Sequence, residues 1–135
     1  MISRILLFAC FSLLSLTAYS QEEGTKAVDL TFDQKHIELG EVVHGEKETF
    51  QYHFTNTGTE SVEVAIVSGC DCTTLDWTRG PIAPGGKGVI DVIFDSTEKE
   101  YSETVDVDLY LKNINPKSDS QYLFILDYTF ELIKK

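Results

Sequence analysis

The strongest constraint on the fold is a large apolar residue that recurs at every second position in three long stretches of the chain. The residues are Ile90, Val92 and Phe94; Val105, Val107, Leu109 and Leu111; and Tyr122, Phe124, Leu126, Tyr128, Phe130 and Leu132. A period of two places successive side chains on opposite faces of an extended chain. Each stretch therefore predicts a β-strand with one buried face.

Four shorter segments repeat this pattern: 28–32, 37–42 with a bend at Gly40, 50–54, and 62–66, where Val62, Val64 and Ile66 are expected to be buried. Turn-forming residues separate them, and no segment has the apolar spacing of a helix. About seven strands in one domain predict an all-β fold, an immunoglobulin-like antiparallel β-sandwich. A small closed barrel is the main alternative.

The first 20 residues have the pattern of a signal peptide. Arg4 precedes the apolar run Ile5–Leu16, and Ala18-Tyr19-Ser20 forms a small-x-small cleavage site. We expect cleavage to leave a mature domain of residues 21–135, located in the periplasm or outside the cell. The apolar run is shorter than the roughly 20 residues that span a bilayer, so no membrane span is expected after cleavage.

Leu7-Phe8-Ala9-Cys10 loosely resembles a lipidation box. Cleavage before Cys10 would leave a hydrophobic region shorter than the usual minimum of about 7 residues. We therefore do not expect Cys10 to carry a lipid.

The chain is acidic, with a formal net charge of -11 that becomes -12 when Arg4 leaves with the signal peptide. Such a surface repels phosphate backbones and anionic membranes, which disfavours nucleic-acid binding. Acidity is compatible with Ca²⁺ or a basic partner, although solubility alone explains it.

The candidate site is the stretch Ser68–Trp77, which holds the only tryptophan and both cysteines outside the first 20 residues. A disulfide between Cys70 and Cys72 would need a bend at Gly69 and Asp71, and its strain would make it easy to reduce. An exported location favours such oxidation.

Two other interpretations of the cysteine pair stay open. In the first, both cysteines are simply small apolar residues at a strand end. Two thiolates are too few for structural Zn²⁺ but could hold Cu(I), with further ligands from the histidines His36, His44 and His53.

Trp77 is expected to fill the core or anchor a loop, with its indole N–H bonded to the backbone. An exposed position would instead indicate a binding hot spot. Asp106, Asp108 and Asp127 can form an acidic stripe, which is better explained as a solvated face than as a Ca²⁺ site. The weak binding candidates are Cys70, Asp71, Cys72 and Trp77.

The sequence offers no catalytic constellation, because no serine lies in a nucleophile-elbow context and the three histidines are scattered. We therefore expect no enzyme activity, no catalytic residues and no cofactor.

Several motifs together resemble domain-of-unknown-function family 1573, a group of exported bacterial proteins frequent in Bacteroidetes. They are Ile37-Glu38-Leu39-Gly40, Phe54-Thr55-Asn56-Thr57-Gly58, Cys70-Asp71-Cys72-Thr73-Thr74, Pro81-Ile82-Ala83-Pro84-Gly85-Gly86-Lys87-Gly88 and Ile90-Asp91-Val92-Ile93-Phe94. The family's usual Cys-Gly-Cys-Thr is Cys-Asp-Cys-Thr here. The resemblance implies an immunoglobulin-like fold related to ASH (Hydin-like) and major-sperm-protein domains, which are mostly non-catalytic binding or assembly modules.

Our leading hypothesis is an exported binding or assembly module for another protein or envelope component, acting through its sheet edges. The alternative is a periplasmic metal-binding (Cu-type) or redox protein that uses Cys70 and Cys72. A hydrolase with a site assembled from distant residues is a third, weaker hypothesis. The sequence leaves the partner and the oligomeric state open.

Overall fold

The computed structural model describes residues 26–135, so the predicted signal peptide and Cys10 lie outside it. The described residues form eight strands and no helix. The strands are β1 (Leu30–Phe32), β2 (His36–Val43), β3 (Lys47–Asn56), β4 (Val64–Ser68), β5 (Thr73–Trp77), β6 (Lys87–Asp95), β7 (Glu103–Asn115) and β8 (Ser120–Ile133). Accordingly, the described part of the chain has no helix long and apolar enough to cross a membrane.

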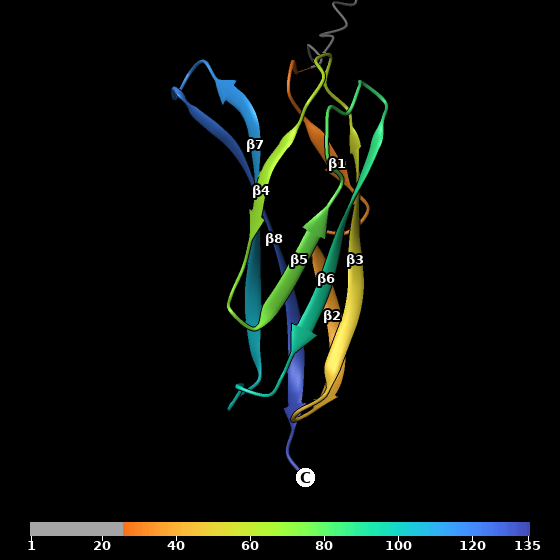
Figure 1. Cartoon of the computed structure of the whole chain (residues 1–135), viewed down its shortest axis with the longest axis vertical. Coiled ribbons are helices and arrows are strands. Elements are labelled where there is room, and N and C mark those ends of the chain that lie inside the picture. The colour runs from red at the N-terminus through yellow and green to blue at the C-terminus, as the bar shows by residue number, and fades with distance from the viewer. Residues whose placement is uncertain (1–25) are drawn as a thin grey trace, which may run out of the picture.

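The strands form two four-stranded sheets that pack face to face (Figure 1). The first sheet has the order β1-β3-β6-β5 and the second sheet has the order β2-β8-β7-β4. All pairings are antiparallel except that β2 runs parallel to β8. The predicted immunoglobulin-like sandwich is confirmed. The strands form two separate sheets and not the closed barrel that was the alternative.

The core lies between the two sheets and is built from the residues that the alternation predicts to be buried. Ile90, Val92 and Phe94 of β6 are all fully buried, and Leu126, Tyr128 and Phe130 of β8 are at most 1% exposed. The ring centroids of Phe94 and Phe130 lie 4.5 Å apart, so the two sheets meet through aromatic contacts as well as aliphatic ones.

The prediction for β4 is wrong at Ile66, whose side chain is 50% exposed, whereas Val67 is 4% exposed. A β-bulge between Val64 and Ile66 adds one residue relative to β7. The extra residue shifts the alternation, so Val67 takes the buried position and Ile66 points to solvent. The bend expected at Gly40 is confirmed by a similar register shift and by a φ of 72° there.

The strand β5 was not among the segments predicted from the sequence. Its partly buried residues Thr73, Leu75 and Trp77 alternate with two exposed ones. The inward-facing side of β5 begins with the polar residue Thr73 and is only half-buried. The alternation of apolar and polar residues that predicts a strand is therefore weak in this segment.

Asn56 fixes the turn after β3 from a fully buried position. Its amide nitrogen donates to the carbonyl oxygens of Glu60 and Ile82, and its amide oxygen accepts from the backbone N–H of Gly58. These bonds satisfy the buried side chain and hold the turn against the Ile82 segment.

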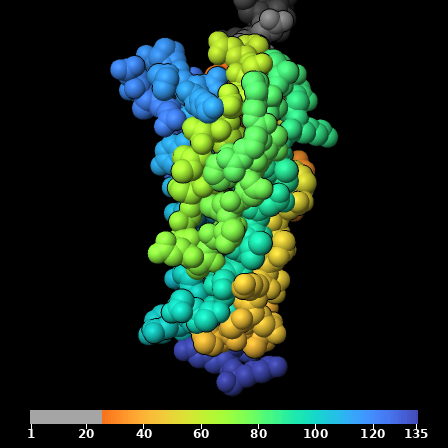
Figure 2. Space-filling model, viewed as in Figure 1, coloured from red at the N-terminus to blue at the C-terminus, as the bar shows by residue number. Residues whose placement is uncertain are grey.

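The ends of β7 and β8 continue beyond the sandwich as a hairpin, which projects from the body of the molecule (Figure 2). The strands pair as far as Asn115 and Ser120, and a tight turn that contains Asp119 at a φ of 56° joins them.

We predict that Gly88→Ala destabilises the protein, because Gly88 pairs with Phe54 and a Cβ there would overlap the Phe54 ring, with Cε1 at 2.8 Å. Overpacking of this kind costs about 1–3 kcal/mol of the free energy of unfolding, measurable by urea titration. Gly69→Ala is the control. Its Cβ would meet the Asp106 carbonyl oxygen at an ordinary 3.4 Å. Equal losses in the two variants would contradict the packing described here.

Candidate functional site

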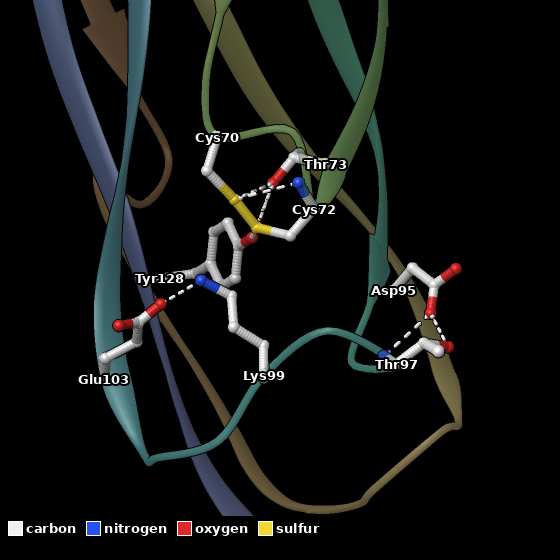
Figure 3. Close-up of a disulfide and its surroundings, with 8 residues drawn as sticks. All are labelled: Cys70, Cys72, Thr73, Asp95, Thr97, Lys99, Glu103 and Tyr128. Carbon is white, nitrogen blue, oxygen red and sulfur yellow. Dashed lines mark hydrogen bonds and ion pairs between the residues drawn. A yellow bond between two sulfur atoms is a disulfide. The ribbon is translucent and has the colours of Figure 1, made fainter.

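The cysteine pair lies where the chain leaves the second sheet at the end of β4 and enters the first sheet at β5 (Figure 3). A tight turn at Asp71 and Cys72 makes this crossing, closed by a 2.9 Å bond from the Thr73 N–H to the Cys70 carbonyl oxygen. The N–H of Asp95 donates to the Cys72 carbonyl oxygen at 2.8 Å. The loop is thereby anchored to the end of β6.

In the structure, Cys70 and Cys72 are joined by a disulfide. Their Cα atoms are 5.2 Å apart, which lies within the range that a disulfide spans. Residues two apart on an extended strand would be separated by roughly 6.6 Å. The turn at Asp71 supplies the bend that the sequence required for this bridge, and the Asp71 side chain itself is exposed.

Hydrogen-bonding groups surround both sulfurs. The Cys72 N–H donates to the Cys70 sulfur at 3.2 Å. The Thr73 hydroxyl lies 3.5 Å from the Cys70 sulfur and 3.4 Å from the Cys72 sulfur. The Tyr128 hydroxyl lies 3.7 Å from the Cys72 sulfur and 2.7 Å from the Thr73 hydroxyl.

Tyr128 reaches this site from the core. Its ring packs against Phe50 and Phe94, with centroid distances of 5.0 and 5.4 Å. Burial of the hydroxyl raises the pKa of Tyr128, while the hydrogen bond with Thr73 acts in the opposite direction. The phenol therefore stays protonated at neutral pH and can donate a hydrogen bond.

A surface pocket of about 370 Å³ borders the cysteine loop on the side of Cys70. Its lining residues are Ser68, Gly69, Cys70, Glu103, Thr104, Val105, Asp106 and Asp108. Three of these are carboxylates, and one of them, Glu103, forms an ion pair with Lys99 (Figure 3). The pocket is acidic, so its charge complements a cationic ligand or a basic partner.

Trp77 lies at the far end of β5, roughly 13 Å along the strand from its start beside Cys72. Its indole nitrogen is buried without a hydrogen-bond partner, which differs from the backbone bond that we expected. The Arg79 guanidinium covers the ring at 3.9 Å and pairs with Asp76, whose pKa the Arg79 hydrogen bond lowers. The structure thus groups Cys70, Asp71 and Cys72 but places Trp77 apart from them.

The acidic stripe exists in part. Asp106 and Asp127 lie directly opposite each other on β7 and β8. His36 interrupts the stripe, because its ring bonds to Asp127 at 2.5 Å and to Glu38 at 2.7 Å. The hydrogen bonds to Glu38 and Asp127 raise the pKa of His36.

The three histidines are not gathered around the sulfurs as copper ligands would be. The His36 ring bonds to carboxylates, His44 bonds to the Thr97 carbonyl oxygen at 3.0 Å, and His53 is exposed on β3. Within residues 26–135, no three His, Cys, Asp or Glu side chains are placed to share a metal ion.

The sequence placed Thr73 within the candidate stretch without a role of its own, and it did not indicate Tyr128 as a residue of the site. Thr73 directly follows Cys72, so its position in the chain was a usable signal. Tyr128 was predicted only as a core residue, because a sequence does not show which strand of the second sheet faces the loop.

The fold and the site define a small immunoglobulin-like domain with a Cys-x-Cys disulfide at the crossing between its sheets. The sequence matches the family described as "Protein of unknown function (DUF1573)" over residues 30–123, and the chain belongs to this family. The predicted resemblance is confirmed. No curated protein matches the chain.

Solved structures share the fold at low sequence identity. A protein of unknown function from Porphyromonas gingivalis W83 is 17% identical with a TM-score of 0.63, over 85% of this chain and 51% of that one. The present chain therefore spans about half of that protein. The ASH/PapD-like domain 7 of human CEP192 is 13% identical with a TM-score of 0.55, over 82% and 88%. The VesB protease of Vibrio cholerae is 14% identical with a TM-score of 0.58, over 76% and 31%. At these identities the similarity shows a shared fold.

We predict that His36 makes the stability of the protein depend on pH. Because the pKa of His36 is raised in the folded state, its ion pairs stabilise the protein below pH 6.5, and this contribution is lost as pH rises through the raised pKa. The difference in the free energy of unfolding between the wild type and His36→Gln should decrease as the pH rises from 6.5 through the raised pKa of His36. The difference should shrink in an Asp127→Asn background. A pH-independent difference would contradict the ion pairs.

Proposed function

We propose that this protein is an exported, non-catalytic immunoglobulin-like module that binds another protein or envelope component through the outer face of the second sheet. The observation that carries the proposal is an apolar row on that face. Ile66, Tyr110 and Leu123 are neighbours across β4, β7 and β8. Ile125 extends the row and is 58% exposed. We call these four residues the apolar row.

The row is unusual for a solvated sheet face, where polar residues normally alternate with the buried ones. Ile66 and Leu123 are 50% and 44% exposed. The bulge in β4 places Ile66 there, so the exposure follows from the backbone of β4 as well as from its sequence. Clustered apolar side chains with a polar border are typical of protein-binding surfaces.

Charge indicates the kind of partner. Asp108 lies opposite Ile125, and Asp106 lies opposite Asp127 one row further along. A partner with apolar residues flanked by lysine or arginine would complement this border. A second copy of the chain fits less well, because it would bring the same carboxylates together.

The free edge of the second sheet supports the same use of this face. β4 is the last strand of that sheet, and its outer side has no strand partner within residues 26–135. A partner strand added along β4 would lie next to Ile66 and prolong the apolar row.

Export is part of the proposal. The signal-peptide pattern of residues 1–20 supports it, and a disulfide is typical of an oxidising compartment outside the cytoplasm. We infer that the mature chain begins at Gln21 and acts in the periplasm or at the cell exterior.

Site-specific photo-crosslinking in the producing cell tests the proposal. A photoreactive residue at Ile125 should give one discrete crosslinked protein, whereas the same residue at the exposed position Gln51 on the first sheet should give none. Ile66→Asp should weaken binding of the isolated partner roughly tenfold or more. Intact mass of the envelope fraction should give Gln21 as the first residue. Crosslinks equal from both faces, only a crosslinked dimer of this chain, or an uncleaved cytoplasmic product would contradict the proposal.

A further inference from the structure

We propose that Cys70 and Cys72 form a thiol–disulfide exchange site for a protein thiol that is carried on a basic surface. This inference is independent of the apolar row, because exchange is measurable with small thiols and without any bound partner. It rests on four observations: the small loop that the disulfide closes, the surface pocket that Cys70 lines, the hydroxyl groups beside Cys72, and the carboxylates of that pocket.

The disulfide closes a loop of only three residues, from Cys70 to Cys72. Cross-links that close short loops restrict the unfolded chain little, so they add little to folding stability. The sandwich core does not need the bond to hold its sheets together, because the buried faces of β6, β7 and β8 already join them. The bond can therefore open and close in a folded protein.

The two sulfurs have different surroundings. Cys70 lines the surface pocket, and its sulfur accepts from the Cys72 N–H. The Thr73 hydroxyl lies beside both sulfurs, whereas the Tyr128 hydroxyl lies 3.7 Å from the Cys72 sulfur (Figure 3). An incoming thiolate reaches Cys70 first. Cys72 is then the sulfur that leaves.

The exchange has two balanced steps. The partner's thiolate attacks the Cys70 sulfur, which forms a mixed disulfide and releases Cys72 as a thiolate that carries the electron pair of the broken bond. A second thiolate of the same partner then attacks the partner's sulfur in the mixed disulfide. The protein is left with two reduced cysteines and the partner with one disulfide. The reverse sequence oxidises Cys70 and Cys72 at the expense of a partner disulfide.

Tyr128 favours release of Cys72, because its hydroxyl lies 3.7 Å from the Cys72 sulfur and hydrogen bonds to a thiolate stabilise its charged form. The Thr73 hydroxyl lies 3.4 Å from the same sulfur and can donate to it as well. Tyr128 can donate to the Thr73 oxygen at 2.7 Å, which leaves the Thr73 proton free to face a sulfur. A thiol of lower pKa is a better leaving group, so these donors accelerate the first step. Both act by positioning a proton and stabilising charge on Cys72, and neither forms a covalent bond.

The carboxylates of the pocket select the partner. Glu103, Asp106 and Asp108 line the approach to Cys70. Among the residues that the structure describes, only Glu103 of these three forms an ion pair, with Lys99. An anionic thiol is repelled from this approach, and a cationic one is attracted. The site therefore discriminates against small acidic thiols and favours a cysteine flanked by lysine or arginine.

Reduction by three small thiols of different charge tests the selection. Cysteamine, 2-mercaptoethanol and 2-mercaptoethanesulfonate carry +1, 0 and -1, and their rates are compared per thiolate. We expect cysteamine to react roughly tenfold faster than the sulfonate at low salt, with the ratio falling towards one at high salt. The same protein unfolded in urea should show a smaller preference, because the net charge and Asp71 remain but the carboxylates of the pocket are no longer held at Cys70. A folded protein that reacts with all three at equal rates, or no faster than the unfolded chain, would overturn the proposal.

Tyr128→Phe tests the role of the donors, because it keeps the aromatic ring and removes only the hydroxyl. We expect reduction by cysteamine to slow roughly three- to tenfold. Tyr52→Phe is the matched control. The hydroxyl of Tyr52 is also part-buried but donates to the Asp127 carbonyl oxygen, away from the sulfurs. Equal rates in wild type and Tyr128→Phe, or equal slowing in the two variants, would show that Tyr128 has no part in exchange.

Discussion

The packing of Tyr128 between the sheets is the interaction on which the fold and the site both depend. Its ring belongs to β8 of the second sheet and rests on Phe50 and Phe94 of the first. Its hydroxyl meets Thr73 at the start of β5. Because the ring is buried, the hydroxyl has a defined position, and the cysteine loop is held against a rigid core instead of moving freely above it.

The features on which both proposals rest lie along one side of the second sheet, where β4 pairs with β7. The bulge in β4 turns Ile66 outward, and the same strand then runs to Gly69 and Cys70. The carboxylates of β7 separate the apolar row from the cysteine loop: Asp108 pairs with Ser68, and Asp106 lines the pocket at Cys70. A protein bound on the apolar row would therefore lie next to the disulfide. The same surface can therefore bind a partner protein and exchange a disulfide with it.

The sequence predicted most of the fold because the alternation in β6, β7 and β8 is long and regular, and these strands build the core. It failed where a single residue changes the backbone. The bulge at β4 exposes Ile66, and nothing in Val64-Ala65-Ile66 marks the extra residue. β5 was missed because Thr73 begins its inward face. At the site, the bend at Asp71 followed from local geometry. The contact of the Tyr128 hydroxyl with the Cys72 sulfur joins positions 56 residues apart, which no local pattern encodes.

Thiol–disulfide exchange at Cys70 and Cys72 requires that the sandwich keep its fold whether the cysteine pair is oxidised or reduced. The direct test compares the free energy of unfolding of the oxidised protein with that of the protein reduced by dithiothreitol, using urea titration. For the three-residue loop, loop-closure entropy gives a difference of at most about 1.6 kcal/mol. We predict a difference within that value and an unchanged dependence on urea. A reduced protein that loses cooperative unfolding would contradict the account.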